Sequence, residues 1–165
     1  MLTPLQINID GPVCAEFKRP TLVAAKKLVD LLTSLKYNQL QLYIEHTFAY
    51  QHHKEVWEKA DPFTGAEILS LDAYCRARFI ELVPNQNSCG HLHKFLIHKR
   101  YEGLAECPEG VDFGPRPSGP RDAPFSLCPT DARSLDFVSG LYRELLPHFP
   151  SSTYVNAHAR SIAAY

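Results

Sequence analysis

Segments with the spacing of a helix alternate along this chain with segments that have the spacing of a strand. In residues 21–36 (TLVAAKKLVDLLTSLK), apolar side chains from Leu22 to Leu35 recur every three or four positions, which is the period of an amphipathic helix, and Thr21 can cap its start. In residues 38–50, the apolar residues Leu40, Leu42 and Ile44 occupy every second position, which is the period of a strand. The sequence therefore predicts a helix followed by a strand.

The same pair of elements follows once more. Residues 64–79 have helical spacing, with Phe79 the last residue of the apolar stripe. Thr64 with Glu67 three positions on has the arrangement of a capping box. Residues 80–85 (IELVPN) are a short apolar run, which predicts a buried strand that is stopped by Pro84 and opens into a loop. Alternating helices and strands are typical of a parallel sheet covered by helices.

The second half of the chain shows this alternation less clearly. We expect a short helix over residues 91–99, a last strand over 151–159 and an opening strand near 13–17. We also expect a helix over 131–146, capped by Thr130 and with Leu135 on its apolar stripe. Residues 105–129 are rich in Pro and Gly, so we expect a long loop there.

The length leaves two architectures open. A closed (β/α)8 barrel typically takes about 250 residues, and this chain has 165. The chain is therefore either a small open α/β sheet or the N-terminal portion of a (β/α)8 TIM barrel, incomplete, with parallel strands alternating with helices. We treat residues 1–165 as one partial domain, in which residues 1–20 fit the pattern poorly. In both folds, chemistry is expected just after the carboxyl ends of the strands.

Polar side chains follow two of these strands. With the opening strand counted first, Glu45 and His46 come after the second strand, and Asn85, Asn87 and His91 come after the third. Carboxylate, imidazole and amide groups together suit a polyhydroxylated ligand. Four aromatic residues that could pack on a sugar ring lie nearby in the sequence: Tyr43, Phe48, Tyr50 and Trp57. The competing interpretation is that the asparagines form ordinary turns and the aromatic rings belong to the core.

The composition argues against several partners. Seventeen Lys and Arg balance eighteen Asp and Glu, for a net charge of −1 without charged blocks, so we expect no nucleic-acid partner. No apolar run approaches the ~20 residues that cross a bilayer, and no signal-like leader opens the sequence, so we expect no membrane association and no export. Five widely spaced cysteines without a CxxC pair indicate reduced thiols and a cytoplasmic location.

Motifs for cofactors and metals are weak or missing. The sequence has no Walker loop, no G-x-G-x-x-G and no G-x-S-x-G, so nucleotide, dinucleotide and acyl-transfer chemistry have no support. His52 with His53, and His91 with His93, leave a metal-dependent α/β enzyme as an alternative. Because side chains two positions apart diverge on a helix, the pair at 91 and 93 is a poor chelate. We expect no cofactor and no metal.

Two segments carry a family resemblance. Residues 38–50 (NQLQLYIEHTFAY) and 73–96 (AYCRARFIELVPNQNSCGHLHKFL) resemble the catalytic barrel of glycoside hydrolase family 20, the β-N-acetylhexosaminidases, in particular its hexosaminidase D-like branch. In that family a strand ends in a Pro-rich segment that leads to a Gly-His pair, and Pro84 with Gly90 and His91 match it.

The resemblance implies a (β/α)8 barrel that hydrolyses terminal non-reducing N-acetyl-D-hexosamine residues of a glycan or glycoside with retention. In this family the acetamido oxygen of the substrate is the nucleophile, an Asp orients the acetamide, and the adjacent Glu is the general acid and base. The resemblance places His91 near the sugar and Glu45 and His46 at the end of the second strand, facing the site. It implies no metal.

The sequence departs from the family where the catalytic pair is expected. The Asp-Glu pair should follow the fourth strand, but the chain continues there with Arg160 and Ser161. No catalytic residue is assigned, and we expect a truncated, inactive member of the family; the alternative is a non-catalytic carbohydrate-binding or interaction remnant. The unpaired strand edges of an incomplete barrel also predict self-association.

Overall fold

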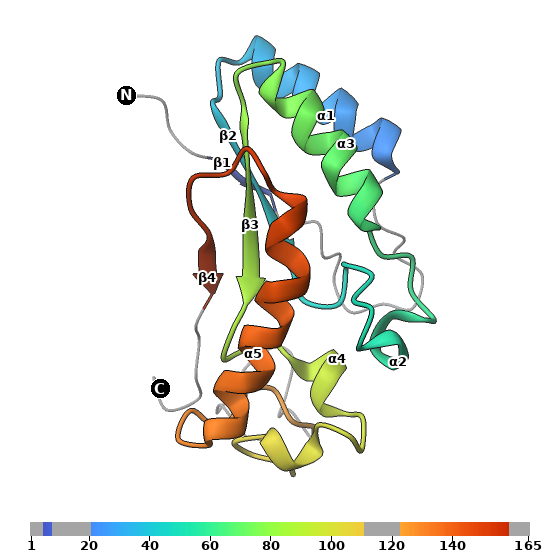
Figure 1. Ribbon diagram of the computed structural model, residues 1–165, viewed down its shortest axis with the longest axis vertical. Helices are drawn as coiled ribbons and strands as arrows, with labels where there is room; N and C mark the ends of the chain where they lie inside the picture. Colours follow the sequence, from blue (N-terminus) through green and yellow to red (C-terminus); the bar gives the residue numbers. More distant parts are fainter. Residues whose placement is uncertain (1–4, 8–20, 111–122, 159–165) are drawn as a thin grey trace, which may run out of the picture. The chain divides into compact units, whose positions relative to one another are not determined.

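A four-stranded sheet, in the order β1-β2-β3-β4, is the centre of the fold (Figure 1). The computed structural model describes residues 5–7, 21–110 and 123–158. The strands are β1 (Leu5–Ile7), β2 (Gln39–Ile44), β3 (Glu81–Asn87) and β4 (Asn156–His158). β2 is parallel to both β1 and β3, so the expected parallel arrangement of the two central strands is confirmed.

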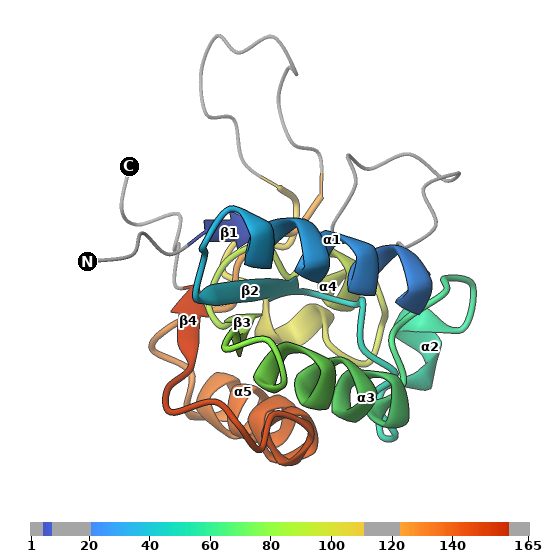
Figure 2. The same cartoon turned by 90° about the horizontal axis from the view of Figure 1, so that it is seen from above.

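Helices connect consecutive strands. The helical elements in chain order are α1 (Leu22–Ser34), α2 (Lys54–Trp57), α3 (Gly65–Arg76), α4 (His93–Leu96), the 3-10 turn η1 (Glu102–Leu104), α5 (Ala132–Leu145) and the 3-10 turn η2 (Leu146–His148). α1 and α3 lie side by side along one face of the sheet (Figure 2). Strand, helix and parallel strand therefore alternate as predicted, which confirms the α/β class.

The chain divides into two compact units. The first consists of residues 1–86 and 142–156, and the second of residues 87–141 and 157–165. The boundaries fall within β3, α5 and β4, so these elements contribute residues to both units.

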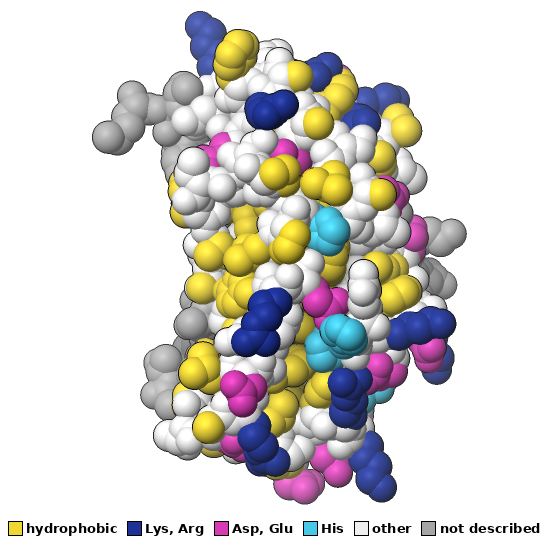
Figure 3. Space-filling view, in the orientation of Figure 1, with side chains coloured by type: hydrophobic (Ala, Val, Ile, Leu, Met, Phe, Trp, Pro, Cys, Tyr) yellow, Lys and Arg dark blue, Asp and Glu magenta, His cyan; other side chains and the backbone are white. Residues whose placement is uncertain are grey.

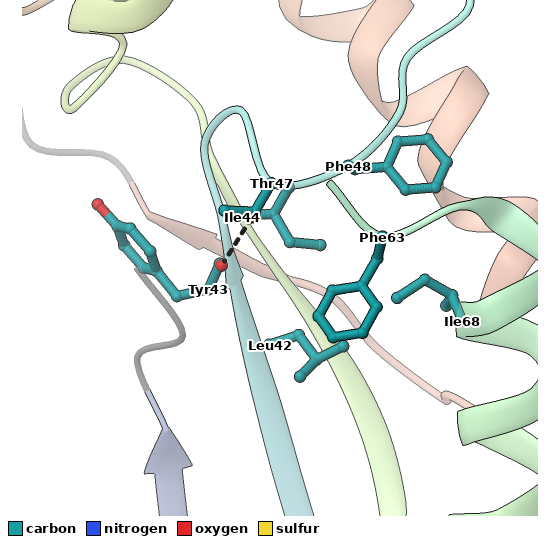
Figure 4. A pocket seen from close by; sticks show the side chains of 7 residues that line it. All are labelled: Leu42, Tyr43, Ile44, Thr47, Phe48, Phe63 and Ile68. Atoms are coloured by element: carbon teal, nitrogen blue, oxygen red, sulfur yellow. Dashed lines mark hydrogen bonds between the residues drawn. The ribbon is translucent and has the colours of Figure 1, made fainter. Parts of the chain in front are cut away.

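β2 presents alternate side chains to opposite sides, as its sequence predicts. Leu42 and Ile44 point toward α3 and line a small pocket with Phe63 and Ile68, whereas the ring of Tyr43 points away from that pocket (Figure 4). The apolar side of β2 thus forms the core of the first unit against α3. Its other side, which faces away from α3 and carries Tyr43, is defined here as the inner side of the sheet.

The capping box of α3 is confirmed. Thr64 Oγ1 accepts a hydrogen bond from the backbone N of Glu67 at 3.3 Å, and the Glu67 carboxylate accepts one from the backbone N of Thr64 at 2.9 Å. At the other end of the helix, Phe79 was expected on the buried stripe but is 92% exposed. The reason is that α3 ends at Arg76 and Phe79 adopts a left-handed backbone conformation, with φ of 60°, in the turn beyond it.

α1 also matches its pattern except at its end. Thr21 accepts a hydrogen bond from the backbone N of Ala24, and Ala25, Val29 and Leu32 are buried. Leu35 was expected on the same stripe but is 58% exposed, because it follows the last helical residue.

β3 is longer than its sequence predicts. The strand does not stop at Pro84 but continues to Asn87, and Pro84, Asn85 and Gln86 align with three consecutive residues of β2. Asn85 and Asn87 therefore lie in the strand and not in a loop after it. Pairing with β2 overrides the turn preference of asparagine and the usual exclusion of proline from inner strands.

The start of α5 differs from the prediction. Asp131, and not Thr130, precedes the first helical residue, and its Oδ1 accepts a hydrogen bond from the backbone N of Arg133 at 2.9 Å. Leu135, expected on the buried stripe, is 71% exposed. Phe137 packs in its place, with its ring centroid 5.4 Å from that of Phe95, so the buried stripe is rotated from the predicted one.

Other features of the second unit follow the expected pattern in part. α4 has four residues, fewer than the predicted helix over 91–99. Ala105 and Leu127 form an antiparallel bridge that joins the two ends of the long loop. Residues 111–122 of that loop, and the expected strand at 13–17, lie outside the described residues. β1 was not predicted.

The described helices and cysteines bear on two further expectations. Cys75, Cys89, Cys107 and Cys128 are free thiols, while Cys14 lies outside the described residues. No helix in the described ranges has the length and apolar character needed to cross a membrane. Acidic and basic side chains are interspersed on the face of the molecule that Figure 3 shows.

Candidate functional site

Glu45 and His46 form a polar pair directly after β2. Their side chains are 14% and 21% exposed, respectively, and His46 Nδ1 lies 4.0 Å from Glu45 Oε2. The carboxylate can accept hydrogen bonds from hydroxyl groups, and the imidazole can donate or accept one. The pair therefore sits at the carboxyl end of a parallel strand, where ligands of such sheets bind.

Asn85 is the most unusual polar residue of the first unit. Its side chain is fully buried and aligned with Tyr43 of β2, and among the described residues neither its amide oxygen nor its amide nitrogen has a hydrogen-bond partner. A buried amide without partners costs about 1–3 kcal/mol. Asn85 therefore offers one unused acceptor and two unused donor hydrogens next to an aromatic ring.

Further amides lie on the same inner side of the sheet. Gln41 Nε2 donates to Gln39 Oε1 at 2.8 Å, and Asn156 Nδ2 donates to Gln41 Oε1 at 2.9 Å. Gln39, Gln41 and Tyr43 share one side of β2 because alternate residues of a strand face the same way. The inner side of this sheet is thus lined by hydrogen-bonding groups, and those of Gln39 and Gln41 are paired with each other.

In the second unit, Asn87 and His91 lie together. Asn87 is fully buried, and its Nδ2 donates to the backbone O of His91 at 3.0 Å. The His91 ring makes an edge contact with Phe125 at a centroid distance of 4.4 Å, and His91 has a left-handed φ of 57°. The backbone turn therefore holds the imidazole against an aromatic ring.

The predicted site residues thus form two local groups. Glu45, His46 and Asn85 belong to the first unit, and Asn87 and His91 to the second. Three of the four nearby aromatic residues, Tyr43, Phe48 and Tyr50, are 7%, 3% and 0% exposed and are buried in the first unit. For these three rings the interpretation as core residues is the correct one.

Two interactions of the first unit had no signal in the sequence. The Tyr50 hydroxyl donates to the side-chain oxygen of Gln86, and Trp57 Nε1 donates to the backbone O of Tyr50 at 2.8 Å. Burial, with the nearby Glu144 carboxylate as a second cause, raises the pKa of Tyr50 well above its usual value, so the hydroxyl stays protonated. Each of these two hydrogen bonds joins segments whose periodic patterns do not depend on each other, so neither could be predicted from the sequence.

An open cleft of about 470 Å³ lies on the helical side of the first unit. Its lining includes Phe48, Gln51, Gly65, Arg143, Glu144 and His148. A Cβ atom on Gly65 would lie 2.3 Å from the His148 ring, so only glycine allows this ring to pack at the start of α3. Within the described part of the chain, no three His, Cys, Asp or Glu side chains group as metal ligands.

A comparison of the sequence with models of protein families identifies the family of this chain. The model of the glycosyl hydrolase family 20 catalytic domain matches residues 19–158. The chain belongs to glycosyl hydrolase family 20. The catalytic domain of this family is a (β/α)8 barrel, so the parallel strands and helices of this family 20 chain are part of such a barrel. A search of curated proteins gave no match.

Several solved structures share this fold. A chitobiase from Flavobacterium johnsoniae is 20% identical, with a TM-score of 0.66 over 90% of this chain and 22% of its own. An exo-β-N-acetylglucosaminidase from Vibrio harveyi is 18% identical, with a TM-score of 0.71 over 95% of this chain and 27% of its own. The β-N-acetylhexosaminidase of Streptomyces coelicolor is 20% identical, with a TM-score of 0.60 over 88% of this chain and 30% of its own. The family 20 chain therefore spans less than a third of each of these proteins.

Proposed function

We propose that this chain forms part of the sugar-binding wall of a β-N-acetylhexosaminidase-type barrel that acts on terminal N-acetylhexosamine residues. The observation that carries the proposal is Asn85, a fully buried amide with unused donors and acceptor on the inner side of the sheet. The similar structures include enzymes named for chitobiose and N-acetylglucosamine. An amide side chain can form hydrogen bonds with sugars of this kind. We place the chain in the N-terminal half of the barrel and in the hexosaminidase D-like branch.

The proposed ligand contacts follow from the side-chain chemistry. The Glu45 carboxylate accepts hydrogen bonds from sugar hydroxyls, His46 orients that carboxylate, and Asn85 donates to and accepts from the ligand. Asn87 and His91 are proposed sugar-binding residues of the second unit. None of the five residues is assigned as the nucleophile, general acid or general base.

The family reaction requires an Asp-Glu pair that this sequence lacks at the expected place after β4. General acid catalysis contributes about 10²- to 10⁴-fold to the rate. We therefore propose that these 165 residues by themselves bind the sugar without hydrolysing it. Assay with an aryl N-acetylglucosaminide should show no release of the aryl alcohol above buffer. Turnover by the purified chain that disappears in His91→Ala would refute this.

Calorimetric titration with N-acetylglucosamine tests the binding site itself. We expect Asn85→Ala to weaken binding at least tenfold, because two or more hydrogen bonds to the ligand are lost. Asn38→Ala is the matched control, since Asn38 is exposed at the opposite end of β2 and should leave affinity unchanged. Equal affinities for wild type and Asn85→Ala would contradict the assignment of Asn85.

Self-association and location complete the proposal. Two apolar residues of α1 are exposed: Val23 (64%) and Leu31 (54%). In addition, β1 is an edge strand of the described sheet. We propose that copies of the chain associate through such surfaces. Sedimentation velocity tests this, and we expect the sedimentation coefficient to increase with concentration.

The free thiols favour a reducing, cytoplasmic location, and fractionation of cells that express the tagged chain checks this.

A further inference from the structure

The Glu144 carboxylate binds the backbone of the loop that follows β2. It accepts a hydrogen bond from the backbone N of Gln51 at 2.5 Å and a longer one from the backbone N of His52 at 3.4 Å. These groups belong to the first unit and are 92 and 93 positions apart in the sequence. One carboxylate thus holds two consecutive amides of a loop that has no regular secondary structure at that point.

The position of Glu144 in its helix is unfavourable in itself. Glu144 is the penultimate residue of α5, where the exposed carbonyl groups make the helix end negative. A carboxylate there costs about 0.3–1 kcal/mol, while a cation would be favoured. The two loop amides offset this cost because they donate charge-assisted hydrogen bonds. The contact therefore explains an acidic residue at a helix end that disfavours it.

The loop held by Glu144 reaches the candidate site through Tyr50. Tyr50 precedes Gln51, is fully buried, and donates its hydroxyl hydrogen to the side chain of Gln86 in β3. The backbone O of Tyr50 accepts a hydrogen bond from Trp57 Nε1 at 2.8 Å. The peptide group between Tyr50 and Gln51 is therefore held at both ends, by Trp57 at its oxygen and by Glu144 at its nitrogen. Because adjacent residues of a strand face opposite sides, fixing Gln86 on one side directs the amide of Asn85 to the other.

We infer that Glu144 is a positioning residue for the sugar-binding site: through the loop amides, Tyr50 and Gln86, it sets the orientation of Asn85. The inference rests on the proposed function for its effect on ligand binding. The link between Glu144 and the loop stands independently of any ligand. Glu144 itself contacts no substrate in this scheme.

Trp57 reports directly on the position of the loop that Glu144 holds. It is the only tryptophan in the sequence, and its indole N–H donates a hydrogen bond to the backbone O of Tyr50 in that loop. We expect Glu144→Ala to move the Trp57 indole resonance in a nitrogen-proton correlation spectrum and to weaken N-acetylglucosamine binding about tenfold. Glu144→Gln keeps an acceptor oxygen and should restore most of both signals. Asp136→Ala, which removes an exposed acid earlier in α5, is the control and should change neither.

The outcomes separate this inference from the proposed function. An unchanged Trp57 resonance in Glu144→Ala overturns the inference, and so does a shifted resonance with unchanged sugar affinity. Wild-type protein that binds no sugar refutes the proposed function. The Trp57 resonance in wild type and Glu144→Ala still tests the link between Glu144 and the loop. If Glu144→Ala does not fold, hydrogen exchange of the wild type decides: the Gln51 amide should be protected at least tenfold although its residue is exposed, and free exchange overturns the inference.

Discussion

Tyr50 and Gln86 form a side-chain hydrogen bond in which both partners are fully buried, one in the loop after β2 and the other in β3. Tyr50→Phe keeps the ring but removes the donor, so Gln86 loses a buried bond, at a cost of about 1–2 kcal/mol. Urea unfolding should show this loss. Tyr154→Phe is the control, since Tyr154 is 51% exposed and its change should stay within about 0.5 kcal/mol. Equal losses for the two variants would contradict the role of the buried bond.

Gly65 and Gly140 should respond in opposite directions to alanine. Gly65→Ala places a methyl group against the His148 ring and should destabilise the chain by about 1–3 kcal/mol. Gly140 lies within α5, and among the described residues no atom beyond its own helix backbone and chain neighbours comes within 4 Å of its missing Cβ. Gly140→Ala should therefore stabilise by about 0.5–1 kcal/mol. Thermal unfolding measures both. The second change His148→Ala should restore part of the loss in Gly65→Ala, and no restoration would place the cause elsewhere.

Asp131 should stabilise α5 as its cap. Asp131→Ala removes the acceptor for the backbone N of Arg133 and should cost about 1 kcal/mol in the free energy of unfolding. Asp131→Asn retains a capping oxygen while it loses the ion pair with Arg133, which is exposed and worth little. Thr130→Ala should have a smaller effect than Asp131→Ala. The reverse order, measured in urea, would restore Thr130 as the cap.

Cys75 should make the chain less stable at alkaline pH. Burial, with Asp72 as a further cause, raises the pKa of the Cys75 thiol from 9.0 to about 12. Because the folded pKa lies above the unfolded one, the stability from this group is complete below pH 9 and is lost between pH 9 and 12. Its slope approaches about 1.4 kcal/mol per pH unit.

Unfolding of wild type and Cys75→Ala at pH 8 and pH 10 measures that slope. We expect the variant to lose less stability over this interval than the wild type. Cys107→Ala makes the same chemical change at a half-buried thiol and serves as the control. The same slope in wild type and Cys75→Ala would show that the buried thiol does not ionise with the pKa given above.

Periodicity predicted the long elements of this fold because each has a continuous apolar stripe. α1, β2 and α3 appear within a few residues of their expected bounds, and the capping box at Thr64 fixes the start of α3. β1 has three residues, too few for a periodic signal. Phe79 and Leu135 were placed on buried stripes by spacing alone, but the end of one helix and the packing of Phe137 expose them.

The candidate site was predicted in its residues more than in its geometry. The rule that chemistry follows strand ends led to Glu45, His46 and Asn85, and all three lie at the carboxyl end of β2 or β3. Sequence could not show that Asn85 is buried and unpaired among the described residues, because burial depends on the pairing with β2. Nor could it show Glu144 beside Gln51, since no local pattern records a contact between distant segments.

The Asn156–Gln41 hydrogen bond joins residues 115 positions apart, and it has a consequence for the order of folding during translation. The ribosome releases residues 87–141, which make up most of the second unit, before it releases β4. A nascent chain can therefore pack residues 87–141 while the first unit still lacks the partners of Gln41 and of Glu81, which binds Thr153. Contacts of such large separation form slowly, so the side of the sheet that carries Gln41 stays uncovered at this point until β4 emerges.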